Sequence, residues 1–449
     1  MREALVKTEE FKDSLVGRIP KDWEVTCIGD LGSWRGGSTP SKSLASNWSD
    51  GEIVWVSPKD FRGTEITDSE DKITKQALTN HNITLFEAGN VLAVFRSSIL
   101  RHTFPVAIGQ VPFTVNQDVK VLSPRDNVNH RFAFFVLQFL GSEILRAAAK
   151  VGTTVESIDY PTFCNLPIYL PPIKEQEGIV EIIDTLDKAI AHTSSLIAKL
   201  KQMKAGLLHD LLTRGLDENG ELRDAIAHPE QFKDSPLGQV PKDWEVVPIQ
   251  QAAAQVPGAT TIGPFGSNLL ASDYRSVGVP VTFVRDIKAD GFQWNSNIYV
   301  EPKKARELSA HSVQSGDLLA TKMGLPPCIA CVYPEGMALG IITADIIRLR
   351  PNTQISTSQW LSLFINSNAI IRQVRGITGG ITRDKITLHD FRRLLIALPS
   401  LKEQKQITNI LDTYNSRICC EEAYREKLKF QKQGLMHDLL TGKVRVKNA

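Results

Sequence analysis

Two long stretches of the chain carry apolar residues at alternating spacings of three and four positions. In the first stretch these residues are Ile183, Leu186, Ile190, Ile197, Leu200, Leu207 and Leu211, with Thr193 and Lys204 in the polar positions of the series. In the second they are Ile407, Leu411, Tyr414, Ile418, Leu428, Leu435 and Leu439, interrupted by Glu421, Arg425 and Lys432. This heptad pattern predicts two long helices, the first over residues 173–213 and about 60 Å long at ~1.5 Å per residue.

An exposed apolar stripe of this length is unstable in water, so we expect the two helices to pack on each other. The first helix leads from one half of the chain to the other, and the second leads away from that other half. Their pairing therefore predicts an antiparallel coiled coil with one half of the chain at each end and an approximate twofold axis.

The first helix carries a second apolar row beside the heptad seam, formed by Ile182, Ala189, Leu196 and Met203. A two-stranded coil does not need this row. Two interpretations stay open: the row packs against the rest of the chain, or it receives helices from partner subunits.

The segments that flank the two helices repeat each other. Three motifs occur twice, in the pairs Gly17–Val25 and Gly238–Val246, Leu170–Gln176 and Leu398–Gln404, and Leu208–Thr213 and Met436–Thr441. The first pair shares Pro-Lys-Asp-Trp-Glu-Val, the second ends in Lys-Glu-Gln, and the third shares His-Asp-Leu-Leu-Thr. The residues between these motifs differ. This pattern indicates one scaffold used twice to present two different surfaces.

The differing middle segments, 24–169 and 245–397, have the composition of short strands followed by a helix. The expected strands are 53–56, 91–95, 104–108, 281–284, 317–321 and 344–349, and the expected helices are 131–150 and 357–375. The pattern predicts the α+β class. Cys328 and Cys331 lie in an apolar run without a second ligand pair, so we interpret this run as a buried strand and not as a metal or redox site.

Composition limits the kind of partner. The chain has 449 residues, 42% hydrophobic and 23% charged, which suits two globular modules with a core each. Its formal net charge is only +2, so any contact with nucleic acid must come from local basic patches. The amino terminus lacks the apolar core of a signal peptide, no run approaches the ~18 apolar residues of a membrane span, and we expect a cytoplasmic protein with reduced cysteines.

Several loops carry side chains suited to DNA. Small residues let backbone amides approach phosphates, Arg and Lys suit guanine or phosphate, and Asn and Gln suit adenine. In the first middle segment the candidates are Arg35, Gly37, Ser38, Thr39, Ser41, Lys42, Lys59, Asp60, Arg96, Ser97, Arg101, Asn116 and Gln117. In the second they are Gly263, Phe265, Ser267, Asn268, Arg285, Asp286, Lys322, Met323 and Arg375. For any single residue, ordinary turn chemistry or a solvated surface is the alternative.

Catalytic and cofactor-binding motifs are absent from the sequence. It contains no G-x-x-x-x-G-K-[ST] phosphate loop, no G-x-G-x-x-G after a strand, no His-Glu-x-x-His and no Asn/Asp-Pro-Pro-aromatic loop. His209 and His437 occupy equivalent helix positions without a nucleophile nearby, so capping or packing is their expected role. The chain is expected to bind without doing chemistry.

The two Lys-Asp-Trp-Glu-Val motifs, the loop Gly36–Pro40, the pair Asn116–Gln117, the phrase Gly263–Ser267 and the two Lys-Glu-Gln helices resemble the specificity subunit of type I restriction-modification enzymes. The resemblance covers nearly the whole chain. It implies two target recognition domains, each reading one half of a bipartite, asymmetric site in double-stranded DNA. The two helices would be a spacer that measures the unread gap.

The resemblance also implies partners. Two methyltransferase subunits would use S-adenosylmethionine to methylate adenine, and restriction subunits would use ATP and Mg²⁺ for translocation, while the specificity subunit itself holds no cofactor or metal. The residues expected at subunit interfaces are Ile182, Leu196, Met203, Leu208, His209, Met436 and His437. Two rival interpretations are a stand-alone DNA-modifying enzyme and a coiled-coil adaptor that reads no sequence.

The expected organisation is then a recognition domain over 1–169, a central spacer helix over 170–215 and a polar, turn-rich linker over 216–231. A second recognition domain over 232–397 and a spacer helix with a tail over 398–449 complete the chain.

Overall fold

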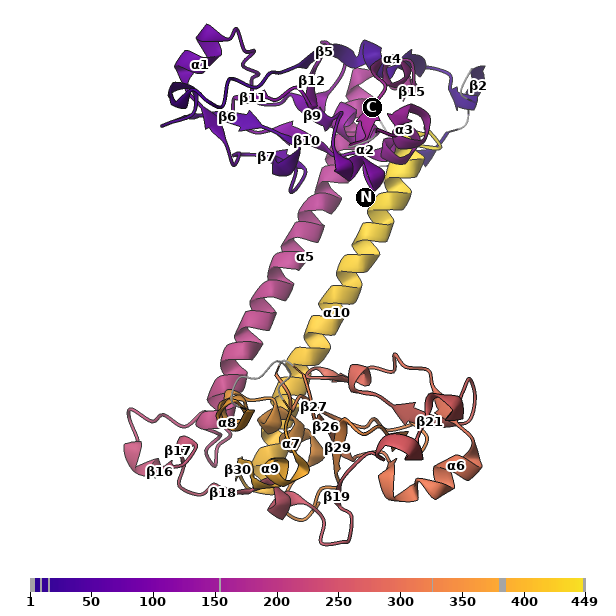
Figure 1. Cartoon of the computed structure of the whole chain (residues 1–449). Coiled ribbons are helices and arrows are strands. Elements are labelled where there is room, and N and C mark those ends of the chain that lie inside the picture. The colour runs from indigo at the N-terminus through magenta and orange to yellow at the C-terminus, as the bar shows by residue number, and fades with distance from the viewer. Residues whose placement is uncertain are drawn as a thin grey trace. The chain divides into compact units, whose positions relative to one another are not determined.

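A computed structural model describes residues 5–8, 10–14, 17–152, 155–324, 326–378 and 385–446. The chain divides into two compact units, unit 1 from Met1–Ser195 with Glu422–Ala449, and unit 2 from Leu196–Glu421. The two long helices α5 (Ile173–Thr213) and α10 (Leu401–Leu440) each contribute residues to both units (Figure 1). The α+β class and the two long helices predicted from the sequence are therefore confirmed.

Unit 1 is built on a five-stranded sheet with the order β5-β12-β9-β10-β7. Its strands are β5 (Gly32–Gly36), β12 (Val119–Pro124), β9 (Val91–Val94), β10 (Val106–Gly109) and β7 (Glu65–Ile66), antiparallel except for β10–β7. A second sheet contains β11 (Phe113–Val115), β6 (Ile53–Val56) and β8 (Lys72–Ile73). Every residue of β9 and β10 is buried, which explains why these strands are continuous apolar runs.

Unit 2 repeats this arrangement. Its four-stranded sheet β19-β29-β26-β27 corresponds to β5-β12-β9-β10, with strands β19 (Thr260–Ile262), β29 (Ile346–Leu349), β26 (Leu318–Thr321) and β27 (Ala330–Val332). A second sheet has the order β20 (Tyr274–Arg275), β24 (Tyr299–Val300), β21 (Val279–Thr282), β28 (Gly340–Ile342) and β25 (Ser312–Val313). The parallel pair β21–β28 corresponds to the parallel pair β6–β11. The repeat thus extends into segments whose sequences differ.

The helices inside the units differ from the prediction. The structure has two helices where the sequence predicted one. Unit 1 has α2 (His130–Phe139) and α3 (Gly141–Ala148), and unit 2 has α7 (Ser358–Ile365) and α8 (Asn368–Thr378). In unit 1 the second helix begins at a glycine, a weak helix former. In unit 2 the side chain of Asn366 bonds to both backbone groups of Ala330 and so occupies the end of α7. Apolar periodicity continues across both breaks, which is why the sequence pattern did not reveal them.

The repeated motifs at the borders form the base of each unit. In unit 1, β4 (Glu24–Cys27) pairs with β15 (Pro167–Leu170), which leads directly into α5. In unit 2, β18 (Glu245–Pro248) pairs with β30 (Leu395–Leu398), which leads into α10. The hairpins β2 (Phe11–Ser14)–β3 (Gly17–Pro20) and β16 (Phe232–Ser235)–β17 (Gly238–Pro241) precede these pairs.

The remaining elements are short. In unit 1 they are β1 (Leu5–Lys7), α1 (Lys75–Asn80), β13 (Ala149–Lys150), β14 (Ser157–Ile158), α4 (Tyr160–Cys164) and β31 (Val444–Val446). In unit 2 they are β22 (Ile287–Lys288), β23 (Gly291–Phe292), α6 (Pro302–Glu307) and α9 (Leu388–Arg393). Strand β31, near the end of the chain, pairs antiparallel with β1, near its beginning.

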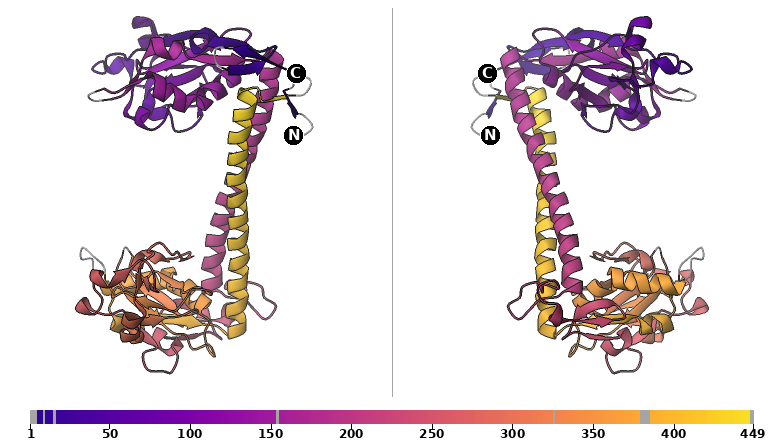
Figure 2. Two further views of the ribbon diagram at one scale, coloured as in Figure 1. Left: turned by 90° about the vertical axis from the view of Figure 1, so that its right-hand side faces the viewer. Right: turned by 90° about the vertical axis from the view of Figure 1, so that its left-hand side faces the viewer.

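Most apolar residues of the heptad seam are buried, whereas Ile190, Leu207, Tyr414 and Leu435 are half-buried. In α5, Ile183, Leu186, Ile197, Leu200 and Leu211 are buried, and in α10 the same holds for Ile407, Leu411, Ile418, Leu428 and Leu439. In unit 1 the helix segments run antiparallel, because Glu175 pairs with Arg445 while Asp187 pairs with Lys432 (Figure 2). In unit 2 the carboxyl end of α5 lies beside the start of α10, where the Leu216 amide donates to Glu403.

Lys432, a charged interruption of the seam, has a structural explanation. Its ammonium group lies 2.7 Å from the Asp187 carboxylate and 5.5 Å from the centre of the Phe135 ring. The aliphatic part of the side chain can thus cover apolar surface while the charge is paired.

Residues 216–231 are not a free linker. Leu216 and Leu222 form a β-bridge with each other and pack against the core of unit 2. Arg214 Nε donates to the Arg223 carbonyl, 2.6 Å away, so the loop is closed on itself. The polar composition, from which a linker was predicted, belongs to a folded loop.

Within the described ranges, none of the helices combines the length and the apolar character needed to cross a lipid bilayer. Cys328 and Cys331 are buried, and burial raises the pKa of each thiol to about 12. The predicted buried strand is confirmed for Cys331, which lies in β27, but not for Cys328, which precedes β27 and has a φ of 67°.

Candidate nucleic-acid interface

The loop after β5 crosses the end of β11. A Cβ atom on Gly37 would lie 1.7 Å from the Val115 carbonyl oxygen, so only glycine allows this close approach. Beyond it, Thr39 Oγ1 donates to Gln117 Oε1 at 2.6 Å. The structure thus brings together two candidates that lie far apart in the sequence.

Backbone carbonyls, and not side chains, anchor this loop. The Ser38 carbonyl accepts from Trp55 Nε1 at 3.0 Å, and the Ser41 carbonyl accepts from Trp48 Nε1 at 3.0 Å. The side chains of Ser38, Ser41 and Lys42 stay exposed, with the Lys42 ammonium 5.9 Å from the Trp48 ring centre. A rigid backbone with exposed donors is what phosphate or base contact requires.

Asn116 and Gln117 have different environments. Asn116 is 5% exposed, and its amide bonds to the backbone and side chain of Asp118. Gln117 is exposed. Asn116 is therefore engaged in a turn of its own unit, whereas the amide of Gln117 lies at the surface.

Asp60 and Asp286 have partners within their own units. Both are buried, and both cap equivalent short helices that follow β6 and β21. Asp60 accepts from the backbone of Ser57 and Glu70, and Asp286 from the backbone of Phe283 and Ser296. In this structure both carboxylates therefore hold turns of the protein.

Lys59 and Arg285, the cations next to Asp60 and Asp286 in the sequence, each bond to side chains of their own unit. Lys59 pairs with Asp71 at 3.0 Å and Glu70 at 3.1 Å, and the hydrogen bond that Lys59 donates to Asp71 raises the pKa of Lys59. Arg285 is exposed, donates to Ser296 Oγ at 2.9 Å and lies 4.8 Å from the Phe283 ring centre. Arg285 therefore keeps most of its donors free for a ligand.

The other unit 1 candidates lie around β5 and the end of β9. Arg35 on β5 and Arg96 after β9 are exposed. Ser97 accepts from the Ile99 amide and caps a short helix. Arg101 is paired with Glu156, and this hydrogen bond lowers the pKa of Glu156.

Unit 2 has a groove of about 410 Å³ that two of its candidates, Arg285 and Met323, help to line. It is lined by Pro264, Gly266, Leu269, Tyr274, Phe283, Val284, Arg285, Met323, Thr343, Ala344 and Asp345. A Cβ atom on Gly263 would lie 2.2 Å from the Thr343 carbonyl oxygen, the same constraint as at Gly37. The loop position is therefore repeated between the units, whereas its side chains differ.

Phe265 stands out at this groove, since 63% of its surface is exposed. Lys322 Nζ lies 5.6 Å from the Phe265 ring centre. Exposed aromatic and cationic side chains side by side suit stacking on a base and contact with its phosphate. Ser267 and Asn268 are exposed in the same loop, whereas Arg375 is exposed on α8 and no described contact joins it to the groove.

Sequence reasoning missed Tyr274, Phe283, Thr343 and Asp345 of this groove. The first two form an edge-to-face pair with ring centres 5.7 Å apart. These residues come from three separate segments, and no local motif marked them. Thr343–Asp345 lies between β28 and β29, just as Asn116–Asp118 lies between β11 and β12. This equivalent position in the repeat was the signal that could have identified Thr343 and Asp345.

The residues expected at subunit interfaces divide by exposure. Ile182 and Met436 are buried in the core of unit 1, whereas Leu196 and Leu208 are half-buried, and Met203, His209 and His437 are exposed. The second apolar row of α5 therefore packs on its own unit at Ile182, while 47% of Met203 is exposed.

Two depressions contain the exposed histidines. In unit 2 one of about 200 Å³ is lined by Leu208, His209, Leu212, Phe364 and Asn368, among others. In unit 1 one of about 740 Å³ is lined by Phe139, Phe430, Met436 and His437, among others. Each lies between the last turns of a long helix and the break between two shorter helices. The depression is thus another repeated feature.

Known proteins to which this chain is similar belong to one group, the type I restriction specificity subunits. The family model described as "Type I restriction modification DNA specificity domain" matches residues 20–202 and 337–429. The EcoR124I/EcoR124II specificity subunit of Escherichia coli is 38% identical over 205 residues, 45% of this chain and 51% of that protein. The MjaVIII specificity subunit of Methanocaldococcus jannaschii is 25% identical over 98% of this chain and 97% of that protein.

Solved structures share the fold. The HsdS subunit from Thermoanaerobacter tengcongensis has a TM-score of 0.50 at 18% identity, covering 95% of this chain and 98% of that one. The S subunit of a type I system from M. genitalium has a TM-score of 0.53 at 13% identity, covering 97% and 98%.

Proposed function

The chain belongs to the family of type I restriction-modification DNA specificity domains, and from this premise we propose that its two units read the two halves of a bipartite, asymmetric DNA site. The observation that carries the proposal is the loop that begins at Gly37 and Gly263. Its backbone is fixed by the same close approach in both units, while the side chains that follow differ. One scaffold would thereby present two specificities.

Unit 1 would read its half-site with polar side chains. Gln117 is exposed beside Thr39 and can pair with adenine through two hydrogen bonds. Arg35, Lys42 and Arg96 are exposed cations that suit phosphates or guanine. Lys59 and Arg101 would contribute only after exchanging their carboxylate partners for phosphate.

Unit 2 would read its half-site through the groove. Phe265 is placed to stack on a base, Lys322 and Arg285 to contact phosphate or guanine, and Asp345 to accept from a cytosine amino group. Ser267 and Asn268 extend the same surface.

The family supplies recognition and not catalysis, so the chemistry belongs to partner subunits. We propose two methyltransferase subunits that bring S-adenosylmethionine, and restriction subunits that bring ATP and Mg²⁺, meeting the DNA in the cytoplasm. The two depressions containing His209 and His437 would receive the two methyltransferase subunits, because a repeated surface suits a partner present twice.

The domain organisation that goes with this function has recognition domains over 1–169 and 232–397. The long helices would set the length of DNA left unread between the half-sites. Residues 216–231 and the tail after α10 would belong to the helix junctions.

A site-selection experiment tests the proposal. The chain with its methyltransferase partner is incubated with a library of random duplexes at about 150 mM salt, because phosphate contacts make affinity depend on salt. We expect enrichment of two different short sequences separated by a gap of fixed length. Equal binding of unrelated duplexes would contradict sequence reading, and methyl transfer by the chain alone would support a stand-alone enzyme instead.

A further inference from the structure

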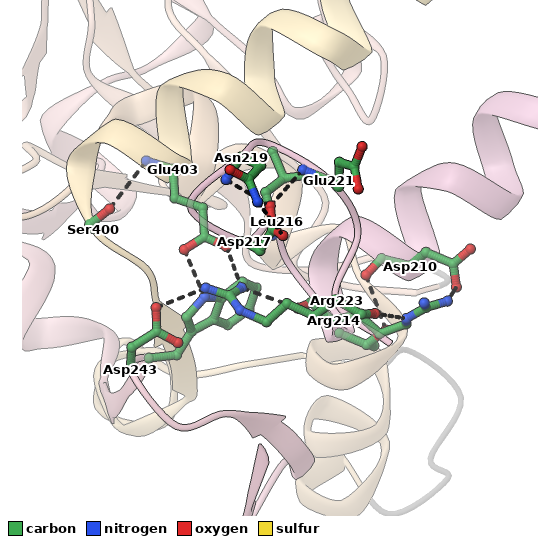
Figure 3. Close-up of polar contacts among 12 residues, drawn as sticks. Asp210, Arg214, Leu216, Asp217, Asn219, Glu221, Arg223, Asp243, Ser400 and Glu403 are labelled. Atoms are coloured by element: carbon green, nitrogen blue, oxygen red, sulfur yellow. Dashed lines mark hydrogen bonds and ion pairs between the residues drawn. The ribbon is translucent and has the colours of Figure 1, made fainter. Parts of the chain in front are cut away.

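The carboxylate of Glu403, in the first turn of α10, is buried and fully engaged (Figure 3). It accepts from the Leu216 amide at 2.7 Å, Arg223 Nη1 at 2.8 Å and Trp244 Nε1 at 3.1 Å. Arg223 also donates through Nη2 to Asp243 at 2.8 Å. We call Arg223, Asp243, Trp244 and Glu403 the unit 2 ion cluster.

Three segments of unit 2 meet in this cluster. Arg223 follows α5, Asp243 and Trp244 lie between β17 and β18, and Glu403 lies in the first turn of α10. Gly215 has a φ of 63°, and a Cβ atom there would lie 2.3 Å from Glu403 Oε1, so the chain needs glycine to pass this close.

Unit 1 contains an equivalent set, the unit 1 ion cluster of Asp22, Trp23, Glu175 and Arg445. Glu175 in the first turn of α5 accepts from Trp23 Nε1 at 2.8 Å and from Arg445 Nη2 at 2.6 Å. Arg445 also donates to Asp22 at 2.6 and 2.8 Å. The repeated Asp-Trp and Lys-Glu-Gln motifs thus bond to each other within each unit.

Arg223 and Arg445 make equivalent contacts in the two clusters, but the chain segments that lead to them differ. Arg223 is reached through the loop that contains Leu216 and Leu222, whereas Arg445 follows α10 after a short turn at Gly442 and lies within β31. Two different connections that deliver the same guanidinium to the same Asp and Glu point to a requirement for the arginine itself.

The glutamine after each glutamate adds a second attachment. Gln176 bonds to the Asn127 carbonyl and the Asn129 amide at the start of α2. Gln404 bonds to the Ile355 carbonyl and the Thr357 amide at the start of α7. The first turn of each long helix is therefore bonded to two parts of its unit, and the direction in which the helix leaves the unit is fixed.

We propose that Arg223 and Arg445 are positioning residues for DNA recognition. Each holds the recognition part of its unit at one angle to a long helix, and thereby restricts the gap length that the two half-sites can have. This inference rests on the proposed function, because a gap exists only if two half-sites are read. Arginine suits the task because its planar fork can bridge two carboxylates, whereas lysine offers the same charge without the fork.

The test compares Arg223→Lys and Arg445→Lys with the wild type and with Arg306→Lys. Arg306 is exposed on α6 of unit 2 and is the matched control. The half-sites selected by the wild type are placed at the preferred gap and at gaps one or two base pairs longer or shorter, and binding to each duplex is measured. Arg223→Met, which can unfold unit 2, is measured in parallel with hydrogen exchange.

We expect each Arg→Lys variant of the clusters to keep the bases preferred at both half-sites and to lose discrimination between gap lengths by about tenfold. Arg306→Lys should keep the wild-type profile. A uniform loss of affinity at all gap lengths, or an unchanged profile, would overturn the positioning role while leaving the proposed function intact. A wild type without any gap preference would contradict the proposed function itself.

Discussion

Gly215 shows how one residue without a side chain supports a unit. Its φ of 63° is unfavourable for other residues, and the Cβ of an alanine would collide with Glu403 and Arg223. We predict that Gly215→Ala lowers the stability of unit 2 by about 1–3 kcal/mol, the usual cost of strain at such a position. Hydrogen exchange of unit 2 amides measures this, since the chain has two units and one unfolding curve would mix them.

Gly206→Ala is the control for this prediction. Gly206 lies in α5, and a Cβ atom there would have no neighbour within 4 Å. The substitution should raise stability by about 0.5–1 kcal/mol, because alanine is the better helix former. If Gly215→Ala were equally harmless, the close packing around Glu403 would not matter to unit 2.

In the proposed function, Gln117 is the exposed amide through which unit 1 would read a base. We predict that Gln117→Ala relaxes the preference at one position of one half-site by about 1–3 kcal/mol, as the loss of a bidentate contact does. Selected sequences before and after the change provide the measurement. Gln110→Ala, at an exposed position after β10, should leave the preference unchanged. A loss spread evenly over all sequences would identify Gln117 as a phosphate contact instead.

Sequence reasoning found the loops at the candidate interface but not the role of each polar residue. Asp60, Asp286 and Asn116 have the chemistry of DNA ligands, yet their side chains are occupied by turns and caps. Nothing in the sequence distinguishes a polar residue that faces outward from one that holds a turn.

At the scale of elements, β31 connects the end of the chain to unit 1. It pairs with β1 and brings Arg445 to Glu175, which is 1% exposed at its side chain. We predict that deleting residues 443–449 destabilises unit 1 by about 3–5 kcal/mol, because the buried carboxylate then has no cation. Hydrogen exchange should show faster opening of unit 1 and unchanged protection in unit 2.

Deleting only residues 447–449 is the control, since it removes none of the described contacts. It should leave both units as protected as in the full chain. Equal loss of protection in the two units after the longer deletion would contradict the assignment of β31 to unit 1 alone.

The elements differ in how well the sequence predicts them. Both ends of α5 agree with the prediction, because a heptad pattern repeated over many turns and bounded by prolines and a glycine is a strong signal. The α2–α3 and α7–α8 breaks were missed, because apolar residues continue across them and tertiary contacts such as that of Asn366 decide where each helix ends. The folded loop within 216–231 could not be predicted from its polar composition, because only the fold shows that Leu216 is buried and pairs with the half-buried Leu222.

At the scale of the whole molecule, the structural repeat includes segments in which the sequence repeat cannot be recognised. Corresponding sheets, parallel strand pairs, capped turns and ion clusters occur in both units, although the middle segments share few residues. The motifs that do agree in sequence contribute buried residues at equivalent positions, such as Trp23 and Trp244 or Gln176 and Gln404, so they maintain the scaffold. Buried bonds such as that from Trp23 to Glu175 explain why these motifs agree while the loops differ.

Independent reading by the two units is the central claim, and exchanging one loop at a time tests it most directly. One variant replaces residues 38–42 by a Gly/Ser segment of equal length and keeps Gly37, and the other replaces 264–268 and keeps Gly263. Site selection with each variant and its methyltransferase partner should show one half-site degenerate and the other intact, with opposite half-sites affected. Loss of both half-sites in each variant, or of neither, would contradict the claim.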